Sequence, residues 1–232
     1  MTSLEHGPSA TQGEEAVFKI ITPDNRAQNS ALIDAMHEMR YRIVVGEWGW
    51  DIPGIAKGYD KDQFDTDDTV YVIVRSRTGE VVGSSRLNPT IHPHMMSELF
   101  ADYCDLQPYP VGRDAWECSR FVTDRSLMED AVDDFRVRCR LGLGLTAWSL
   151  DNKVSRLSWL THQKFFNLVQ RVWDTEPLGL PKREGDGWAW IPAVSRMDEA
   201  TFDRQLDRYR NADAIVAQYM GARSAPSQAQ VV

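Results

Sequence analysis

The sequence predicts an α/β fold in a single domain, built as a mixed, twisted β-sheet with helices on both faces. The chain has 232 residues, of which 42% are hydrophobic, which suits one compact domain. Some predicted strands form a hairpin and others alternate with helices, a combination typical of a mixed sheet between two helical layers. Residues 69–76 are mostly valine, isoleucine and tyrosine, as in a central strand buried on both faces. We therefore expect a three-layer sandwich.

The two ends of the chain differ in composition from its centre. Residues 1–15 are polar and contain glycine and proline, so we expect a disordered N-terminal extension. The domain is expected over residues 16–220, followed by a flexible tail at 221–232. No internal repeat and no linker divides the domain.

The first third of the domain is predicted as strand, helix, loop and hairpin. Residues 16–21 alternate in the manner of a strand. A helix is expected from Ser30 to about Val45, because apolar side chains recur along one side of it. An aspartate-rich loop at 51–69 leads to the central strand, and a turn at 77–79 joins that strand to a second one at 80–87. The apolar side of the helix consists of Leu32, Met36, Met39 and Ile43.

The middle of the domain contains an irregular stretch and a strand with charged residues. Residues 88–114 include four prolines, and only 95–103 within them suggest a short helix. A strand at 116–121 follows. Residues 129–150 are expected to form a long helix, although two glycines weaken its middle.

The last third alternates between strands and helices. Residues 154–161 are expected to form a strand, and 162–173 an amphipathic helix with its phenylalanine, leucine and valine side chains inward. A last strand at 188–194 and a helix at 197–219 complete the domain.

Composition excludes several classes of protein. The formal net charge of −8 argues against nucleic-acid binding through bulk charge. The N-terminus has no apolar signal-peptide segment, and no apolar run reaches transmembrane length, so we expect no membrane association. The cysteines, Cys104, Cys118 and Cys139, are odd in number and form no CxxC motif. Free thiols in a reducing cytoplasm are the simplest explanation.

The strand at 116–121 contains a carboxylate and a guanidinium, Glu117 and Arg120. Buried charges are costly unless they are paired or bind a charged ligand, although an edge strand could also leave both side chains in solvent. Strict alternation puts these two side chains on opposite faces of the sheet. If both serve one site, the strand must be bulged or twisted between them.

Three further clusters accompany this strand: Arg40 with Trp48 and Trp50, the acidic loop, and Arg86 at a strand end. Core packing of the tryptophans, a solvated loop, and a salt bridge from Arg86 to that loop are the simpler interpretations of each. Together, carboxylates, arginines and tryptophan rings suit a cationic, amino-acid-like ligand. Glu117 could then remove a proton from the ligand's amine. The loop aspartates are Asp51, Asp60, Asp62, Asp65, Asp67 and Asp68.

Other chemistries find little support. The acidic loop lacks the central glycine and terminal glutamate of an EF-hand, and His92 and His94 have no neighbouring cysteine or glutamate motif, so we expect no metal site. Ser119 has no histidine and aspartate at recognisable spacing, and Cys118 is expected to be an inert strand residue. Residues 138–144 nearly match the pyrophosphate-binding loop of acetyltransferases, but a cysteine replaces the first arginine or glutamine of that motif.

Five motifs in order resemble the acyl-homoserine lactone synthases of the LuxI type, bacterial autoinducer synthases. The resemblance extends from about residue 16 to residue 194 and implies a GNAT-like fold. It also implies S-adenosylmethionine as a substrate and an acyl donor that is a thioester of acyl carrier protein or of coenzyme A. No prosthetic group or metal is implied. The motifs are Arg40, Trp48-Gly49-Trp50, Asp62-Gln63-Phe64-Asp65, Arg86-Leu87 and Glu117-Cys118-Ser119-Arg120-Phe121.

The resemblance assigns roles to individual residues. Val44 stands where the family usually has phenylalanine, and Trp48 replaces a leucine. The loop before Asp62 looks one residue longer than usual, which leaves open which of the aspartates between 60 and 68 enter the site. The implied catalytic residues are Glu117, Arg120, Asp62, Asp65 and Arg86. Those implied to bind S-adenosylmethionine are Arg40, Val44, Trp48, Trp50 and Arg120.

The acyl side of the site is expected around Ser158, Trp159 and Thr161. The bulky ring of Trp159 favours short, branched or aryl acyl groups, which often arrive as coenzyme A thioesters. A basic patch could dock either donor, with solvated helix faces as the alternative. Its members would be Arg136, Arg138, Arg140, Lys164 and Arg171. We expect a monomer or weak homodimer. The rival functions are an N-acyltransferase acting on another amine and a non-catalytic ligand-binding relative.

Overall fold

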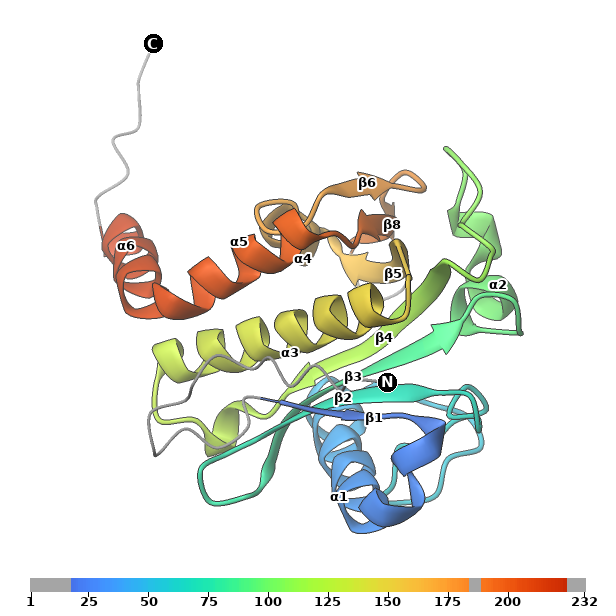
Figure 1. The fold of residues 1–232 in the computed structure, drawn as a ribbon, viewed down its shortest axis with the longest axis horizontal. Coiled ribbons are helices and arrows are strands. Elements are labelled where there is room, and N and C mark those ends of the chain that lie inside the picture. Colours follow the sequence, from blue (N-terminus) through green and yellow to red (C-terminus); the bar gives the residue numbers. More distant parts are fainter. Residues whose placement is uncertain (1–17, 184–188, 225–232) are drawn as a thin grey trace, which may run out of the picture.

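The computed structural model describes residues 18–183 and 189–224. Within these residues, one mixed sheet has the strand order β1-β2-β3-β4-β5-β8-β6, and β7 also pairs with β8 (Figure 1). All neighbours are antiparallel except β4 and β5. The strands are β1 Lys19–Ile21, β2 Val70–Arg75, β3 Val81–Pro89, β4 Ala115–Thr123, β5 Arg156–His162, β6 Thr175–Pro177, β7 Lys182–Arg183 and β8 Ala189–Arg196.

Helices cover both faces of the sheet, which confirms the expected three layers. In Figure 1, α1 lies below β1–β4, whereas α3 crosses the opposite face and α5 runs above α3. The α-helices are α1 Ser30–Tyr41, α2 Met95–Leu99, α3 Ala131–Asp151, α4 Gln163–Val169, α5 Glu199–Arg210 and α6 Ala212–Ser224. Short 3₁₀ turns occupy Pro23–Asn25, Ala27–Asn29, Ala101–Tyr103 and Arg125–Leu127.

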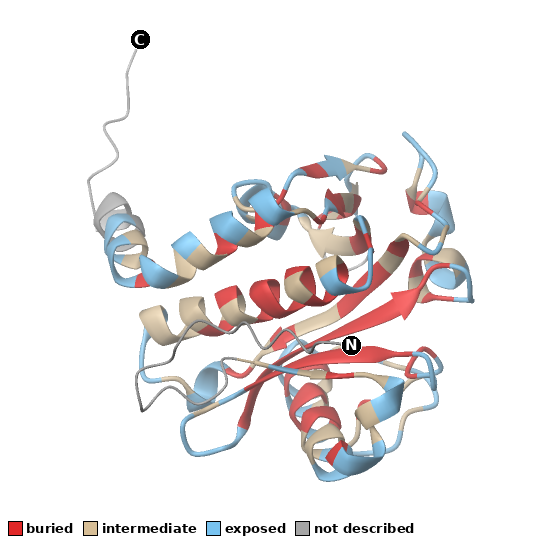
Figure 2. Ribbon diagram, in the orientation of Figure 1, coloured by how far each residue is buried: buried red, intermediate tan, exposed pale blue. Residues whose placement is uncertain are grey.

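The central strand is buried on both faces, as its composition predicted. Val72 and Val74 of β2 belong to the larger core on the α3 side, and Tyr71 and Ile73 belong to a second core under α1. Figure 2 shows β2 and β3 as almost entirely buried. Alternation along β2 therefore supplies both cores at once.

The two glycines within α3 mark its closest contacts. A Cβ atom on Gly144 would lie 2.4 Å from Val72 Cγ1, and one on Gly142 would lie 2.5 Å from the side-chain amide of Gln205. The helix thus accepts a lower propensity in order to approach β2 on one side and α5 on the other.

Several boundaries differ from the sequence-based prediction. The first helix changes at Tyr41 into a π-helical turn, Arg42–Glu47. The helix predicted at 162–173 is shorter and ends at Val169, and β6 and β7 were not predicted. The last predicted helix is two helices, separated at Asn211, and the second extends to Ser224, beyond the expected end at residue 219.

Some predictions lie outside the described residues. These are the N-terminal extension, the first two residues of the predicted first strand, Trp188 at the start of the last strand, and the predicted tail from residue 225 onward. Residues 221–224, which were also predicted as tail, belong to α6 instead. In the part of the chain that the structure describes, no helix is both long and apolar enough to cross a membrane.

Strand β4 is where the sheet becomes irregular. It pairs in parallel with β5 only through Ala115–Glu117, so the two strands separate beyond that point. On its other side, Ser84 pairs with Val122 but Arg86 pairs with Ser119, which leaves one extra residue in β4. Arg120 lies in this bulge with a φ of +51°, in the left-handed region that non-glycine residues rarely adopt.

Candidate functional site

A closed ring of six alternating charges lies on the α1 face of the sheet. Its connections, in order around the ring, are Arg40 Nε to Asp60 Oδ2 at 3.0 Å, Asp60 Oδ2 to Arg120 Nε at 2.9 Å, Arg120 Nη2 to Asp62 Oδ2 at 2.8 Å, Asp62 Oδ1 to Arg86 Nη1 at 2.6 Å, Arg86 Nη1 to Asp65 Oδ2 at 3.0 Å, and Asp65 Oδ1 to Arg40 Nη1 at 3.0 Å. Each charge therefore has two partners of opposite sign.

The ring is almost sealed from solvent. The side chains of Arg40 and Arg86 are completely buried, and the most exposed member, Arg120, retains 6% of its side-chain surface. Burial alone would raise the pKa of Asp65, but the charges of Arg86 and Arg40 outweigh it and hold that pKa well below its usual range. The pKa of Asp60 is lowered in the same way. The six side chains thus carry their charges inside the protein and sum to zero.

Four separate chain segments build this ring. Arg40 projects from α1, Arg86 from β3 and Arg120 from the bulge in β4, while the three aspartates come from the loop before β2. Val122 packs in the core under α1, and Phe121 packs in the opposite core. Because β4 has one extra residue at this point, Arg120 can lie on the α1 face together with Glu117 and Ser119. The bulge that the sequence required is therefore present.

The acidic loop is held in shape by its own polar contacts. Asp65 Oδ2 accepts a hydrogen bond from Asp62 N at 3.0 Å, and Asn88 Nδ2 donates to Phe64 O at 3.0 Å. Asp60, which the resemblance left uncertain, is in the ring, whereas Asp67 and Asp68 contact Arg26 and His92 outside it. The proposed salt bridge between Arg86 and the loop is thus part of the site.

Glu117 is fully buried beside the ring and is fixed by backbone donors. Its carboxylate accepts hydrogen bonds from Met95 N at 3.1 Å and Met96 N at 2.5 Å, at the start of α2. Ser119, two residues further along the same face, accepts a hydrogen bond from Arg86 Nε at 2.9 Å. Burial raises the pKa of Glu117 and outweighs these favourable contacts. A carboxylate with a raised pKa is better suited to accept a proton near neutral pH.

Three tryptophan rings cluster at the end of the π-helical turn. The rings of Trp48 and Trp50 lie 5.6 Å apart, and Trp50 meets Trp190 of β8 edge-on at 5.7 Å. Trp48 remains 47% exposed. Trp190 was not identified from the sequence, where it belonged to an ordinary alternating strand. Arg40 and Val44 are fully buried, so Trp48 and Trp50 are the members of the expected S-adenosylmethionine set that offer exposed ring surface here.

Two other kinds of site considered from the sequence were a cysteine nucleophile and a metal site. Burial raises the pKa of the Cys118 thiol to about 12, which agrees with an inert side chain. Among the described residues, no group of three or more histidine, cysteine, aspartate or glutamate side chains is arranged to hold a metal ion.

The profile of autoinducer synthases matches residues 24–204, well over half of the chain. This chain belongs to the autoinducer synthase family.

Individual relatives agree with this family. An acyl-homoserine-lactone synthase of Agrobacterium fabrum is 27% identical over 79% of this chain and 88% of its own. One from Ralstonia nicotianae is 32% identical over 60% of this chain and 69% of its own. An isovaleryl-homoserine lactone synthase of Bradyrhizobium diazoefficiens is 28% identical over 81% and 83%.

Solved structures share the fold. A coenzyme A-dependent acyl-homoserine lactone synthase, BjaI, solved with S-adenosylmethionine and isopentyl-coenzyme A, superposes with a TM-score of 0.73 at 25% identity, covering 82% of this chain and 87% of the other. A putative N-acetyltransferase from Lactobacillus plantarum reaches a TM-score of 0.50 at 16% identity, covering 78% and 99%, which shows a similar fold only. The expected GNAT-like architecture is confirmed.

The residues expected on the acyl side of the site do not lie on one face of the sheet. Trp159 packs against Phe166 and Trp173 in the larger core and donates a hydrogen bond from Nε1 to Ser195 Oγ at 2.9 Å. Ser158 pairs with Glu117 across the parallel strands and points to the opposite face from Trp159, as alternation requires. Trp159 and Thr161 share a face, and Ser158 belongs beside Glu117.

The members of the expected basic patch have interactions within the protein. Arg136 pairs with Asp213, Arg138 pairs with Asp134 and lies over the Phe165 ring, and Arg140 donates to Tyr209 Oη. Lys164 and Arg171 also have interactions. The arginines of α3 therefore make contacts within the protein, and their role in docking a donor stays a prediction.

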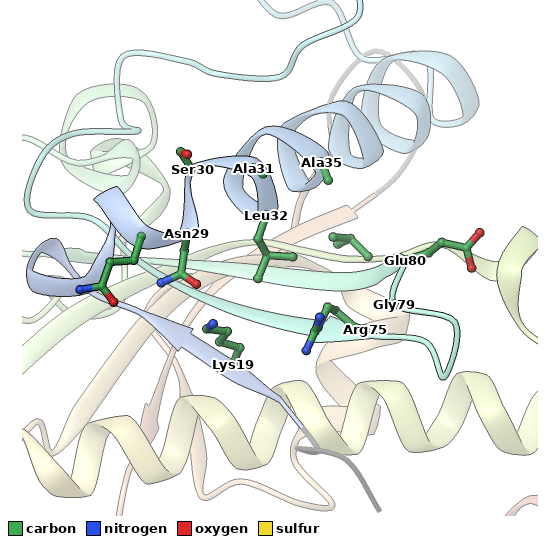
Figure 3. A pocket seen from close by; sticks show the side chains of 11 residues that line it. Lys19, Asn29, Ser30, Ala31, Leu32, Ala35, Arg75, Gly79 and Glu80 are labelled. Atoms are coloured by element: carbon green, nitrogen blue, oxygen red, sulfur yellow. The ribbon is translucent and has the colours of Figure 1, made fainter.

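A separate hollow of about 420 Å³ lies far from the charged ring. It is bounded by the start of α1, by β1 and by the β2–β3 turn, with Lys19, Asn29, Arg75 and Glu80 among its lining residues (Figure 3). No member of the ring lines it, so it is not part of the candidate site.

Proposed function

We propose that this chain is an acyl-homoserine lactone synthase that acylates the amine of S-adenosylmethionine and then closes the lactone. Membership of the family and relatives of that name support the proposal. The observation that carries it is the placement of Glu117, buried and hydrogen-bonded, on the same sheet face as the closed charge ring.

In the first step, the ammonium group of S-adenosylmethionine transfers a proton to Glu117. The resulting amine attacks the thioester carbonyl carbon, a C–N bond forms and the C–S bond breaks. The nitrogen then loses a second proton to the departing thiolate. Backbone N–H groups freed where β4 and β5 separate are the proposed donors to the transient oxyanion.

In the second step, the methionine carboxylate attacks the carbon next to the sulfonium. A C–O bond forms, the C–S bond breaks with its electrons passing to sulfur, and methylthioadenosine leaves as a neutral thioether. The step is intramolecular and the sulfonium is a good leaving group, so the protein need only hold the bent conformer. The ring of paired charges gives this part of the site a fixed shape.

We infer that the acyl donor is a short, branched or aryl thioester of coenzyme A. Trp159 is anchored by Ser195, and its wide ring would shorten an acyl site built on its face of the sheet. Arg136 and Arg138 of α3 are paired with aspartates within the protein. Similar proteins include an isovaleryl-homoserine lactone synthase and a coenzyme A-dependent synthase. The proposal places the reaction in the cytoplasm, where both substrates are made, and in a monomer or weak homodimer.

The test supplies purified protein with S-adenosylmethionine and isovaleryl-coenzyme A and follows methylthioadenosine and the lactone by mass spectrometry. The wild type is expected to make both, and Glu117→Ala and Arg120→Ala to lose at least about 100-fold while remaining folded by circular dichroism. Acylation of another amine without methylthioadenosine would instead support a general N-acyltransferase. Ligand binding without turnover would support a non-catalytic relative.

A further inference from the structure

His94 is a buried histidine with one ring nitrogen unused. It precedes α2 and is completely buried. Its Nδ1 lies 2.9 Å from His92 O, and because a carbonyl oxygen only accepts, Nδ1 must carry the proton. In the neutral ring, Nε2 is then an acceptor, and it has no hydrogen-bond partner. Tyr109 meets the ring edge-on at 5.5 Å and supplies no bond to that nitrogen.

His94 directly precedes the residues that bind Glu117. The two residues after His94 donate their backbone N–H groups to the Glu117 carboxylate. The charge of Arg86 also acts on Glu117, although burial has the larger effect on its pKa. His94 therefore lies next to the proposed base, although the ring and the carboxylate do not bond to each other directly.

Arg86 provides a second unused group beside the same carboxylate. Its Nε binds Ser119 and its Nη1 binds two aspartates of the ring, but its buried Nη2 has no partner. Buried polar groups are nearly always hydrogen-bonded, so an acceptor on His94 and a donor on Arg86, both left unpaired, suit a ligand that satisfies both. An α-amino acid head group fits, because its ammonium donates and its carboxylate accepts.

We propose that His94 is a further substrate-binding residue, whose Nε2 accepts a hydrogen bond from the α-ammonium group of the amine donor alongside Glu117, while Arg86 Nη2 donates to the neighbouring carboxylate. This assignment rests on the proposed function. All three side chains are buried, so the ligand reaches them only when the covering side chains move. Sequence analysis assigned His94 no such role, because its one visible feature was proximity to His92.

The experiment measures dissociation constants by calorimetry for three probes: S-adenosylmethionine, decarboxylated S-adenosylmethionine and methylthioadenosine. His94→Phe keeps a flat ring but removes the nitrogen. It is expected to weaken the first two probes about tenfold, the loss expected for one hydrogen bond to a charged group. Methylthioadenosine, which lacks the head group, should bind within twofold of wild type and so reports that the site is still folded. His94→Gln, which restores an acceptor, should recover part of the affinity.

Unchanged affinity of His94→Phe for S-adenosylmethionine overturns the proposal. So does weakening confined to S-adenosylmethionine, because His94 would then act on the carboxylate. Equal weakening of methylthioadenosine in both variants also overturns it, since the role would be structural. A wild type that binds with this pattern but makes no lactone refutes the proposed function alone, whereas a wild type that binds no S-adenosylmethionine refutes both.

Discussion

Asp65 illustrates how single residues hold this site together. Its carboxylate binds Arg40 and Arg86 and also accepts from Tyr71 Oη at 3.0 Å. Replacing it with asparagine would leave two guanidinium groups buried with one carboxylate fewer between them. Removing one partner of a buried ion pair is far more costly than the pair's net contribution to stability.

Asp65→Asn is therefore expected to lower the free energy of unfolding by about 3–5 kcal/mol, measured by urea denaturation. The matched control is Asp174→Asn, which breaks the exposed Arg196–Asp174 pair and should cost less than about 1 kcal/mol. Similar losses in the two variants would show that the ring is no more important to stability than a surface pair.

Glu117 gives the site a defined pH dependence. Because burial raises its pKa, the folded chain holds this proton more tightly than the unfolded chain does. Its contribution to stability is thus complete below the ordinary carboxyl pKa and is lost as pH rises through the raised value. Over the same interval the carboxylate form increases, so kcat/KM should rise.

The free energy of unfolding of the wild type, minus that of Glu117→Gln, is accordingly expected to fall as pH increases from about 4 to 8. Glu98→Gln, the same change at an exposed side chain of α2, should leave the wild-type profile unchanged. A Glu117→Gln profile parallel to that of the wild type would contradict the raised pKa.

Trp50 is the third residue with a testable role. If its ring lines the S-adenosylmethionine site, Trp50→Phe should raise KM for that substrate about two- to fivefold with normal stability, because a smaller ring binds a cation less well. Trp116→Phe, at a ring packed on Trp148 in the core, should lower stability and leave KM unchanged. Lost stability with an unchanged KM in Trp50→Phe would make Trp50 a core residue as well.

At the scale of elements, β4 determines which side chains lie on the α1 face of the sheet, and α3 packs against the opposite face. The bulge in β4 moves Arg120 to the face of Glu117, and the closeness of α3 to β2 keeps the opposite core tight. A single methyl group tests that closeness. Alanine at Gly144 gains about 1 kcal/mol of helix propensity but places Cβ against Val72 and 3.0 Å from Phe18.

Gly144→Ala is expected to lower stability by about 1–3 kcal/mol, because core side chains cannot withdraw without losing packing. In Gly142→Ala the obstacle is the end of the Gln205 side chain, which can turn aside, so its loss should be smaller. Thermal unfolding of both variants decides the matter, and equal or increased stability of Gly144→Ala would show that the two elements are not tightly packed.

At the scale of the whole molecule, the sheet separates the charged ring and Glu117 from Trp159. The charged ring and Glu117 occupy the α1 face, whereas Trp159 belongs to the core on the face of α3. The amine and acyl substrates would then approach the gap between β4 and β5 from different sides. Changes on the acyl side should therefore alter donor preference without altering KM for S-adenosylmethionine.

Trp159→Leu is expected to shift kcat/KM toward longer acyl groups by up to about tenfold, since each extra buried methylene contributes about 0.8 kcal/mol. Matched acyl groups on coenzyme A and on acyl carrier protein, compared across chain lengths, provide the measurement. Trp148→Leu, a core change on α3, should reduce stability alone. A wild type that prefers long chains on the carrier protein would refute the role of Trp159.

The sequence by itself determined the fold class and most of the elements, and it predicted the chemistry of the site. The apolar run at β2, the spacing along α1 and the motifs around Arg40, Arg86 and Glu117 are local patterns, and periodicity translates directly into a buried face. It also predicted the bulge in β4 on the condition that Glu117 and Arg120 serve one site, because their positions have opposite parity.

Only the tertiary structure decided which residues meet. Asp60 entered the ring, Trp190 joined Trp50, and His94 came to lie beside Glu117 through contacts between segments far apart in the chain. The tertiary structure also decided the place of Gly144, whose low helix propensity is outweighed by packing against β2. It likewise decided the partners of the α3 arginines, which come from α3 itself, from α5 and from α6. Local patterns carry no information about these pairings, because burial and charge compensation depend on the whole fold.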